Sequence, residues 1–227
     1  MRLWPALLAL LAACAASLAE PGLRFVYAYP RVGPVDLRLT GPDGATAEQL
    51  AMGAPGVSPW LPLAWDKGEL TIRPAGVTDG DALIAAPFAA TGRATVIVLQ
   101  PTDEPKLLVL PEALPTVPPG QAAFRVVNAL PGISPLTLKP RRPTGQQPGN
   151  LPEQKVAYGT VGAYQFAEAG LLALRGVRPD KDNPFDWEVA SLRTLPGAVY
   201  TIVLMGLPAP GSEELPLTLL PLVDRLP

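Results

Sequence analysis

The sequence contains no histidine and a single cysteine, Cys14. Without histidine there can be no imidazole general base, no Ser-His or Cys-His nucleophile pair and no histidine ligand for zinc. Because Cys14 lies at the N-terminus, the mature protein should contain no disulfide and no thiolate nucleophile. A nucleophile elbow and a glycine-rich phosphate loop are missing as well. We therefore expect neither an enzymatic activity nor a cofactor.

Charged residues are also scarce, at 17% of the chain, and 18 basic residues nearly balance 20 acidic ones. A nucleic acid or an anionic membrane surface would need a concentrated basic face, so neither is an expected partner. The small basic cluster at residues 139–142 is interpreted as a solvated loop that could touch an anionic envelope polymer. Paired carboxylates can hydrolyse glycosides without histidine, but no such pair can be recognised in the sequence.

Proline is abundant instead, with 30 residues spread along the whole chain, and hydrophobic residues make up 48% of it. Because a proline inside a helix costs about 3 kcal/mol, this spacing leaves little room for long helices and favours short strands joined by turns. One short helix is predicted, at residues Thr46–Met52 (TAEQLAM). The hydrophobic content is high enough for a substantial core.

The N-terminus has the features of an export signal. Arg2 precedes an apolar stretch at residues 3–13 that is too short to span a bilayer stably. Two processing routes are open: cleavage after 17–19 (SLA), which defines a signal segment at residues 1–19, or lipidation of Cys14, since residues 11–14 (LAAC) resemble a lipobox. No later apolar stretch predicts a membrane span, so we expect membrane attachment only if Cys14 is lipidated.

The two halves of the chain repeat one another. Four blocks recur in the same order: 23–30 with 124–131, 57–60 with 161–164, 94–99 with 200–204, and 104–111 with 214–221. Arg24 and Arg125 fall at the same place in the first block, as do Ala28 and Ala129. Such self-similarity indicates a duplication.

The repeated blocks have the patterns of β-strands. Residues 35–39 (VDLRL) alternate between apolar and polar, which predicts a strand with one buried face. Residues 95–99 (TVIVL) are continuously apolar or β-branched, which predicts a central strand covered on both faces. We therefore predict an all-β protein with two tandem immunoglobulin-like or transthyretin-like β-sandwich domains, at 20–114 and 122–227, joined by a semi-rigid proline-rich linker at 115–121.

These blocks resemble a family of exported bacterial repeats, DUF 4397, a domain of unknown function. The resemblance lies in "FVYAYP" followed by "GPVDLRL", in "FRVVNALPG", in the "ATVIVLQ" and "YTIVLMG" strands and in "LLVLPEALP", and it covers most of residues 23–224. Members occur as tandem copies on secreted or cell-envelope proteins, so the resemblance implies a fold and an exported location but no activity. The second copy departs from the pattern, because Thr137 stands where the first copy has Asp36 and residues 139–152 form an inserted loop.

The aromatic residues near turns are the best candidates for a binding surface. They are Trp60, Trp65, Tyr164 and Trp187. Aromatic side chains at such places can stack on sugars or anchor a protein partner. In a sandwich without disulfides, large aromatics also fill the core, so both interpretations are open.

A weak calcium candidate lies at Asp180, Asp182 and Asp186, because hard cations bind clustered oxygen ligands. Pro184 takes the place of one oxygen donor, and an acidic turn between strands is the alternative.

From these patterns we expect an exported, non-enzymatic module that is periplasmic, cell-envelope-bound or extracellular and acts in adhesion, scaffolding or contact with an envelope protein or polysaccharide. The alternative is a carboxylate-dependent hydrolase or a small-ligand carrier. A deep pocket lined by two facing acids would favour that alternative.

Overall fold

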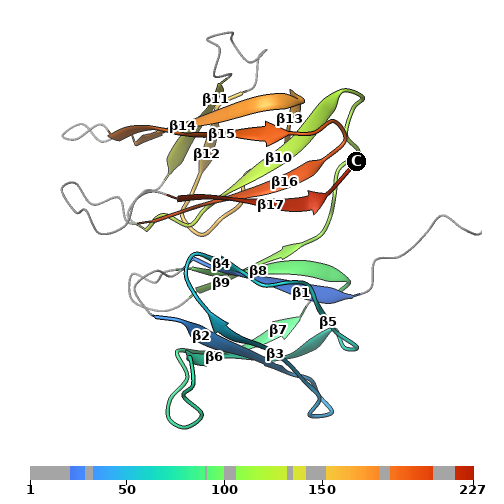
Figure 1. Cartoon of the computed structure of the whole chain (residues 1–227), viewed down its shortest axis with the longest axis vertical. Helices are drawn as coiled ribbons and strands as arrows, with labels where there is room; N and C mark the ends of the chain where they lie inside the picture. The colour runs from blue at the N-terminus through green and yellow to red at the C-terminus, as the bar shows by residue number, and fades with distance from the viewer. Residues whose placement is uncertain are drawn as a thin grey trace, which may run out of the picture.

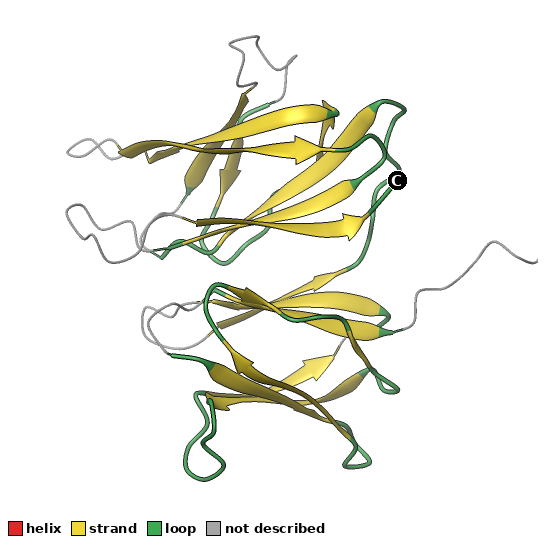
Figure 2. Ribbon diagram, viewed as in Figure 1, coloured by secondary structure: helices red, strands yellow, loops and turns green. Residues whose placement is uncertain are grey.

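The computed structural model describes residues 21–28, 33–89, 91–99, 106–131, 135–141, 152–178, 185–206 and 218–227. These residues form strands and loops without a helix (Figure 2), so the predicted all-β class is confirmed. In this part of the chain there is no helix of the length and apolarity needed to cross a membrane. The predicted signal segment and Cys14 lie outside the described residues.

The first nine strands form two sheets (Figure 1). One sheet has the order β4-β1-β8-β9, with β5 also paired to β1, and the other has the order β3-β2-β6-β7. The strands are β1 (Gly22–Tyr27), β2 (Val35–Thr40), β3 (Thr46–Met52), β4 (Gly56–Val57), β5 (Leu61–Pro62), β6 (Lys67–Pro74), β7 (Ile84–Ala89), β8 (Arg93–Leu99) and β9 (Lys106–Pro111). We call this part of the chain repeat 1.

The remaining eight strands form two more sheets with corresponding orders, β13-β10-β16-β17 and β12-β11-β14-β15. They are β10 (Gln121–Asn128), β11 (Leu136–Arg141), β12 (Gln154–Val156), β13 (Gln165–Glu168), β14 (Gly170–Arg178), β15 (Phe185–Thr194), β16 (Val199–Met205) and β17 (Thr218–Arg225). We call this part repeat 2. In each repeat the opening strand pairs in parallel with the penultimate one, β1 with β8 and β10 with β16. The shared topology fits a duplication, while the exact domain boundaries stay a prediction.

Residues Thr46–Met52 form strand β3, so the predicted helix is wrong. A helix of two turns has too few internal hydrogen bonds to repay its nucleation. The same residues pair with β2 instead, where Leu37 lies opposite Gln49 and Leu39 opposite Ala47. Ala47 also packs against the buried core of repeat 1. Tertiary pairing therefore overrides a local helical preference.

Each repeat has a core between its two sheets. The first core includes Leu23, Phe25, Leu37, Leu70 and Val96. The second core has the same arrangement in repeat 2, with Phe124, Val126, Leu136, Leu172 and Ile202 among its members. Side chains that alternate along each strand supply these cores from one face of every sheet.

A third core lies between the two repeats, where the sheet of β1 and β8 packs on the sheet of β10 and β16 (Figure 1). Its buried side chains include Val26 and Ile97 from repeat 1 and Val127, Val203 and Leu222 from repeat 2. Strand β8 is therefore covered on both faces, as the sequence predicts. The repeats are held in place by direct packing of sheet on sheet, in addition to the linker.

Asp36, the acidic residue of the "VDL" strand, has a structural role in repeat 1. Its carboxylate accepts hydrogen bonds from the main-chain N–H groups of Ala51, at 2.7 Å, and Gly76, at 2.8 Å. Both donors have positive φ, 51° at Ala51 and 77° at Gly76, so the carboxylate stabilises two turned segments of main chain on either side of β2. These two hydrogen bonds lower the pKa of Asp36 below its ordinary value.

We expect Asp36→Asn to lower the free energy of unfolding at pH 7 by about 1–2 kcal/mol, because an amide cannot accept both bonds with a charged oxygen. A carboxylate with a lowered folded pKa contributes stability above its unfolded pKa and loses it as the pH falls through the folded pKa. The difference between wild type and variant should therefore shrink below pH 3.8. Urea unfolding at several pH values checks this, with the exposed Asp66→Asn as control; an equal effect at both positions contradicts it.

Candidate functional site

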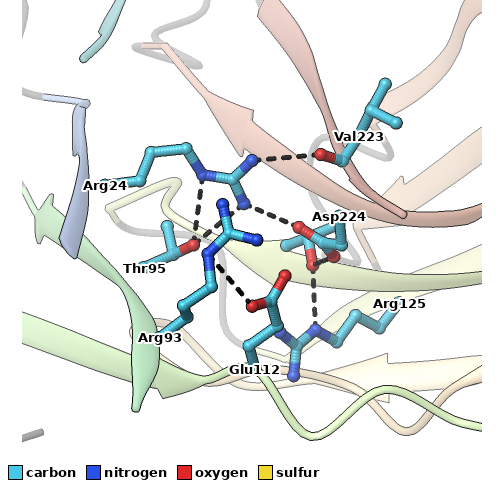
Figure 3. Close-up of polar contacts among 8 residues, drawn as sticks. Arg24, Arg93, Thr95, Glu112, Arg125, Val223 and Asp224 are labelled. Atoms are coloured by element: carbon cyan, nitrogen blue, oxygen red, sulfur yellow. Dashed lines mark hydrogen bonds and ion pairs between the residues drawn. The ribbon is translucent and has the colours of Figure 1, made fainter. Parts of the chain in front are cut away.

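A cluster of buried and partly buried polar side chains lies where the two repeats meet (Figure 3). We call it the inter-repeat polar cluster; its members are Arg24, Arg93, Thr95 and Glu112 of repeat 1 and Arg125, Thr201 and Asp224 of repeat 2. The alternation of β1 explains why Arg24 lies here. Because Leu23 and Phe25 point into the first core, Arg24 must point toward repeat 2.

Arg24 joins the two repeats. Within repeat 1 its Nε and Nη2 atoms donate to Thr95 Oγ1, at 3.2 and 2.9 Å. Across the interface it donates to Asp224 Oδ1 at 2.6 Å and to the carbonyl oxygen of Val223 at 3.2 Å. The side chains of Arg24 and Asp224 are only 7% and 4% exposed. This is a buried ion pair whose partners come from opposite ends of the chain.

Asp224 also has a partner within its own repeat. Its second oxygen, Oδ2, accepts a hydrogen bond from the hydroxyl of Thr201. Thr201 in turn accepts from Arg125 Nε at 2.9 Å. A continuous chain of hydrogen bonds therefore runs from Thr95 through Arg24 and Asp224 to Arg125.

The cluster is built from equivalent positions of the two repeats. Arg24 and Thr95 correspond to Arg125 and Thr201. The guanidinium group of each arginine packs over an aromatic ring of its own repeat. The guanidinium carbon of Arg24 lies 4.7 Å from the ring centre of Trp60, and that of Arg125 lies 4.8 Å from the ring centre of Tyr164. These are cation–π distances.

The acids also correspond, although the sequence comparison conceals it. Thr95 lies opposite Leu110 and its counterpart Thr201 lies opposite Leu222, so Leu110 matches Leu222. The match of 104–111 with 214–221 made from the sequence is therefore displaced by two residues. Two positions further along lie Glu112 and Asp224, and Asp224 stands at a register shift of repeat 2, where Val199 lies opposite Arg225.

Arg93 breaks the symmetry between the repeats. Its Nε lies 3.5 Å from Glu112 Oε2, and its guanidinium carbon lies 3.9 Å from the centre of the Trp60 ring. Val199 holds the corresponding place in repeat 2, two residues before Thr201 as Arg93 is two before Thr95. Glu112 is therefore held by an arginine of its own repeat. Three guanidinium groups face two carboxylates, and the aromatic rings help to balance the excess positive charge.

Burial raises the pKa of Glu112 and of Tyr164. The pKa of Glu112 is raised mainly because its carboxylate is desolvated, an effect that Arg93 partly opposes. Burial likewise raises the pKa of Tyr164 above 10.0. The Tyr164 hydroxyl is buried near Thr201 and Arg125.

We expect Glu112→Gln to gain stability relative to wild type as the pH rises above 4.5. A carboxyl group with a raised folded pKa favours folding when protonated, so wild type loses this contribution between pH 4.5 and the folded pKa of Glu112, whereas glutamine does not titrate. Urea unfolding of both proteins from pH 4.5 to pH 8 measures the difference. A variant that instead becomes less stable relative to wild type over this range would show that the ion pair with Arg93 outweighs desolvation.

The predicted aromatic residues have different surroundings. Trp60 and Tyr164 are half-buried beneath the arginines of the cluster. Trp65 is half-buried against the first core, with its ring centre 5.6 Å from that of Phe88, and a Cβ atom at Gly41 would lie 2.8 Å from its indole. Trp187 belongs to β15, and its side chain lies outside the described part. Ligand binding by these four residues stays a prediction.

The calcium candidate cannot be built from the described residues. Asp180 and Asp182 lie outside them, and Asp186 belongs to β15 with a side chain that is not described. Within the described part, no three residues among histidine, cysteine, aspartate and glutamate are grouped to hold a metal ion. The calcium site stays a prediction.

Comparison with known proteins gives no family. No family model matches the chain, and neither does any curated protein. Among solved structures, the chain is similar to one described as a "putative cell adhesion protein" from Bacteroides fragilis NCTC 9343, at 11% identity, with 88% of this chain and 97% of that chain covered and a TM-score of 0.27. A protein of the same description from Bacteroides eggerthii DSM 20697 shows 9% identity, 89% and 95% coverage and a TM-score of 0.24. A likeness this low carries no functional argument.

Proposed function

We propose that this protein is an exported, non-enzymatic module of the cell envelope or the extracellular space that works as a rigid two-repeat scaffold. It would present its edges and loops to an envelope protein or polysaccharide. The observation that carries the proposal is the third core together with the Arg24–Asp224 pair across it. The export signal expected at residues 1–19 and the resemblance to DUF 4397 support the location.

The rigidity follows from what separation of the repeats would expose. Val26, Ile97, Val127 and Val203 are all fully buried in the third core. Burying one such aliphatic side chain contributes about 1.5–3 kcal/mol, so exposing several of them at once is strongly unfavourable. Separation would also leave the charges of Arg24 and Asp224 without their partner. A binding surface on repeat 1 therefore keeps a fixed geometry relative to one on repeat 2.

The polar cluster supports a structural function for the same interface. Both of its carboxylates are held by guanidinium groups, Asp224 at 2.6 Å and Glu112 at 3.5 Å. A general acid or a nucleophile would need a carboxylate that faces a substrate. Here Asp224 is paired with Arg24 across the interface, and Glu112 is paired with Arg93 inside repeat 1.

Fractionation of the organism that encodes the protein tests the location. We expect a tagged copy in the envelope or medium fraction, and intact mass shows whether the chain starts after residue 19 or carries lipid on Cys14. The purified protein should also bind isolated envelope polymer or protein more tightly than a variant whose third core is disrupted, Val127→Asp. A cytoplasmic location, or equal binding by the variant, would overturn the proposal.

A further inference from the structure

An apolar groove of about 450 Å³ opens at one edge of repeat 1. It lies between β7 and β9, the last strands of their respective sheets. It is lined by residues 83–88, by Leu70 and Val96, and by Leu107 and Val109 of β9. Leu83 and Val109 are each 36% exposed, so the edge of the first core is accessible to solvent here.

The groove combines two kinds of surface. All ten lining residues have apolar side chains, so the polar atoms of its wall belong to the main chain. Because β7 and β9 end their sheets, each has a row of main-chain N–H and C=O groups with no strand of the described chain beside it. An occupant must therefore offer apolar groups and main-chain hydrogen bonds together.

Repeat 2 has a longer strand at the corresponding edge. Its corresponding strand, β15, has ten residues where β7 has six, and β15 approaches β17 to within 8 Å between Cα atoms. Leu192 of β15 and Leu219 of β17 both pack against the second core. In repeat 1, Ala86 of β7 and Leu107 of β9 pack against the first core in the corresponding way, and the groove lies between these two strands.

We propose that the groove between β7 and β9 binds an extended apolar peptide strand from a partner protein. Addition of a strand to an open sheet edge supplies main-chain hydrogen bonds, while alternate side chains fill the groove. Strand β9 is the edge to which the peptide pairs, because Pro87 removes a donor in the middle of β7. An acyl chain would cover the apolar wall but leave the main-chain groups without partners.

This inference goes beyond the scaffold function and does not depend on it, because the groove lies wholly within repeat 1. Its test uses the intact exported protein and a displayed library of random ten-residue peptides. Selection should enrich peptides with alternating apolar residues. In amide NMR spectra, these peptides should shift the signals of β9 more than those of β3, the opposite edge of the second sheet.

Variants on each side of the groove make the test specific. Val109→Trp fills the groove and Leu83→Asp places a charge on its rim, so each should weaken binding at least tenfold. The control is Leu50→Trp, at a 61% exposed position on β3, and it should leave binding unchanged. Melting temperatures show which variants fold. Two groove variants are used so that the test still holds if one of them does not fold.

Modified ligands test the mode of binding. A selected peptide that is N-methylated at alternate residues keeps its side chains but loses main-chain donors, and it should bind at least tenfold more weakly. Failure to enrich any peptide, or enriched peptides that bind both groove variants like wild type, would overturn the proposal. Unchanged binding of the N-methylated peptide, or binding of palmitate but of no peptide, would also overturn it.

Discussion

Asp224→Asn is expected to lower the free energy of unfolding by about 3 kcal/mol, because it leaves the buried charge of Arg24 without a counter-charge. The substitution conserves volume, so the loss reports on charge and hydrogen bonding more than on packing. It also weakens the link to Thr201, which donates to the same carboxylate. Urea unfolding at pH 7, followed by circular dichroism, measures the effect.

The matched control is Glu112→Gln, the equivalent amide substitution in repeat 1. Glu112 is paired more loosely, at 3.5 Å, and its side chain is 14% exposed against 4% for Asp224. We expect no loss of stability from this change at pH 7. Adding Arg24→Met to Asp224→Asn should recover part of the loss, because it removes the unpaired charge. Equal losses at Asp224 and Glu112, or no recovery, would contradict this account.

Val127→Asp is expected to have a still larger effect, a loss of at least about 4 kcal/mol, because a carboxylate would lie unpaired in an apolar environment. Val127 is fully buried in the third core. Calorimetry should show that the single unfolding transition expected for wild type divides into two, since each repeat retains its own core. The control Val77→Asp, at a position 42% exposed, should change stability by less than about 0.5 kcal/mol. A single transition with a small loss would show that the repeats are not coupled through this core.

The sequence predicts the all-β class because the order of apolar and polar residues along a strand reflects which of its faces are buried. The continuous run at residues 95–99 predicts a strand covered on both faces, and β8 has that burial. What lies on its second face could not be read from the run, because a helix, another sheet or a partner would give the same pattern. At Thr46–Met52 the local preference for helix is overridden by pairing with β2.

The polar cluster is only partly visible in the sequence. Arg24 and Arg125 recur at equivalent places inside otherwise apolar strands, and a charged residue at a buried strand position is a signal for a buried partner. The partner acids could not be found in the same way, because the closing blocks match best two residues out of register. Matching prolines, Pro111 and Pro221, favour that false alignment, whereas the hydrogen-bonded register pairs them with non-equivalent residues, Ala94 and Ile202.

The third core also affects whether one repeat could remain monomeric without the other. A single repeat cut from the chain would expose Val26, Ile97 and Leu110 together on one face of a sheet, an apolar surface that favours self-association. The covalent connection keeps the matching sheet nearby at an effective concentration on the order of millimolar, so the chain covers this surface before a neighbouring molecule can. Arg93 pairs with Glu112 within repeat 1, and this further distinguishes repeat 1 from repeat 2. The covalent connection thereby converts a surface prone to aggregation into an interface inside one molecule.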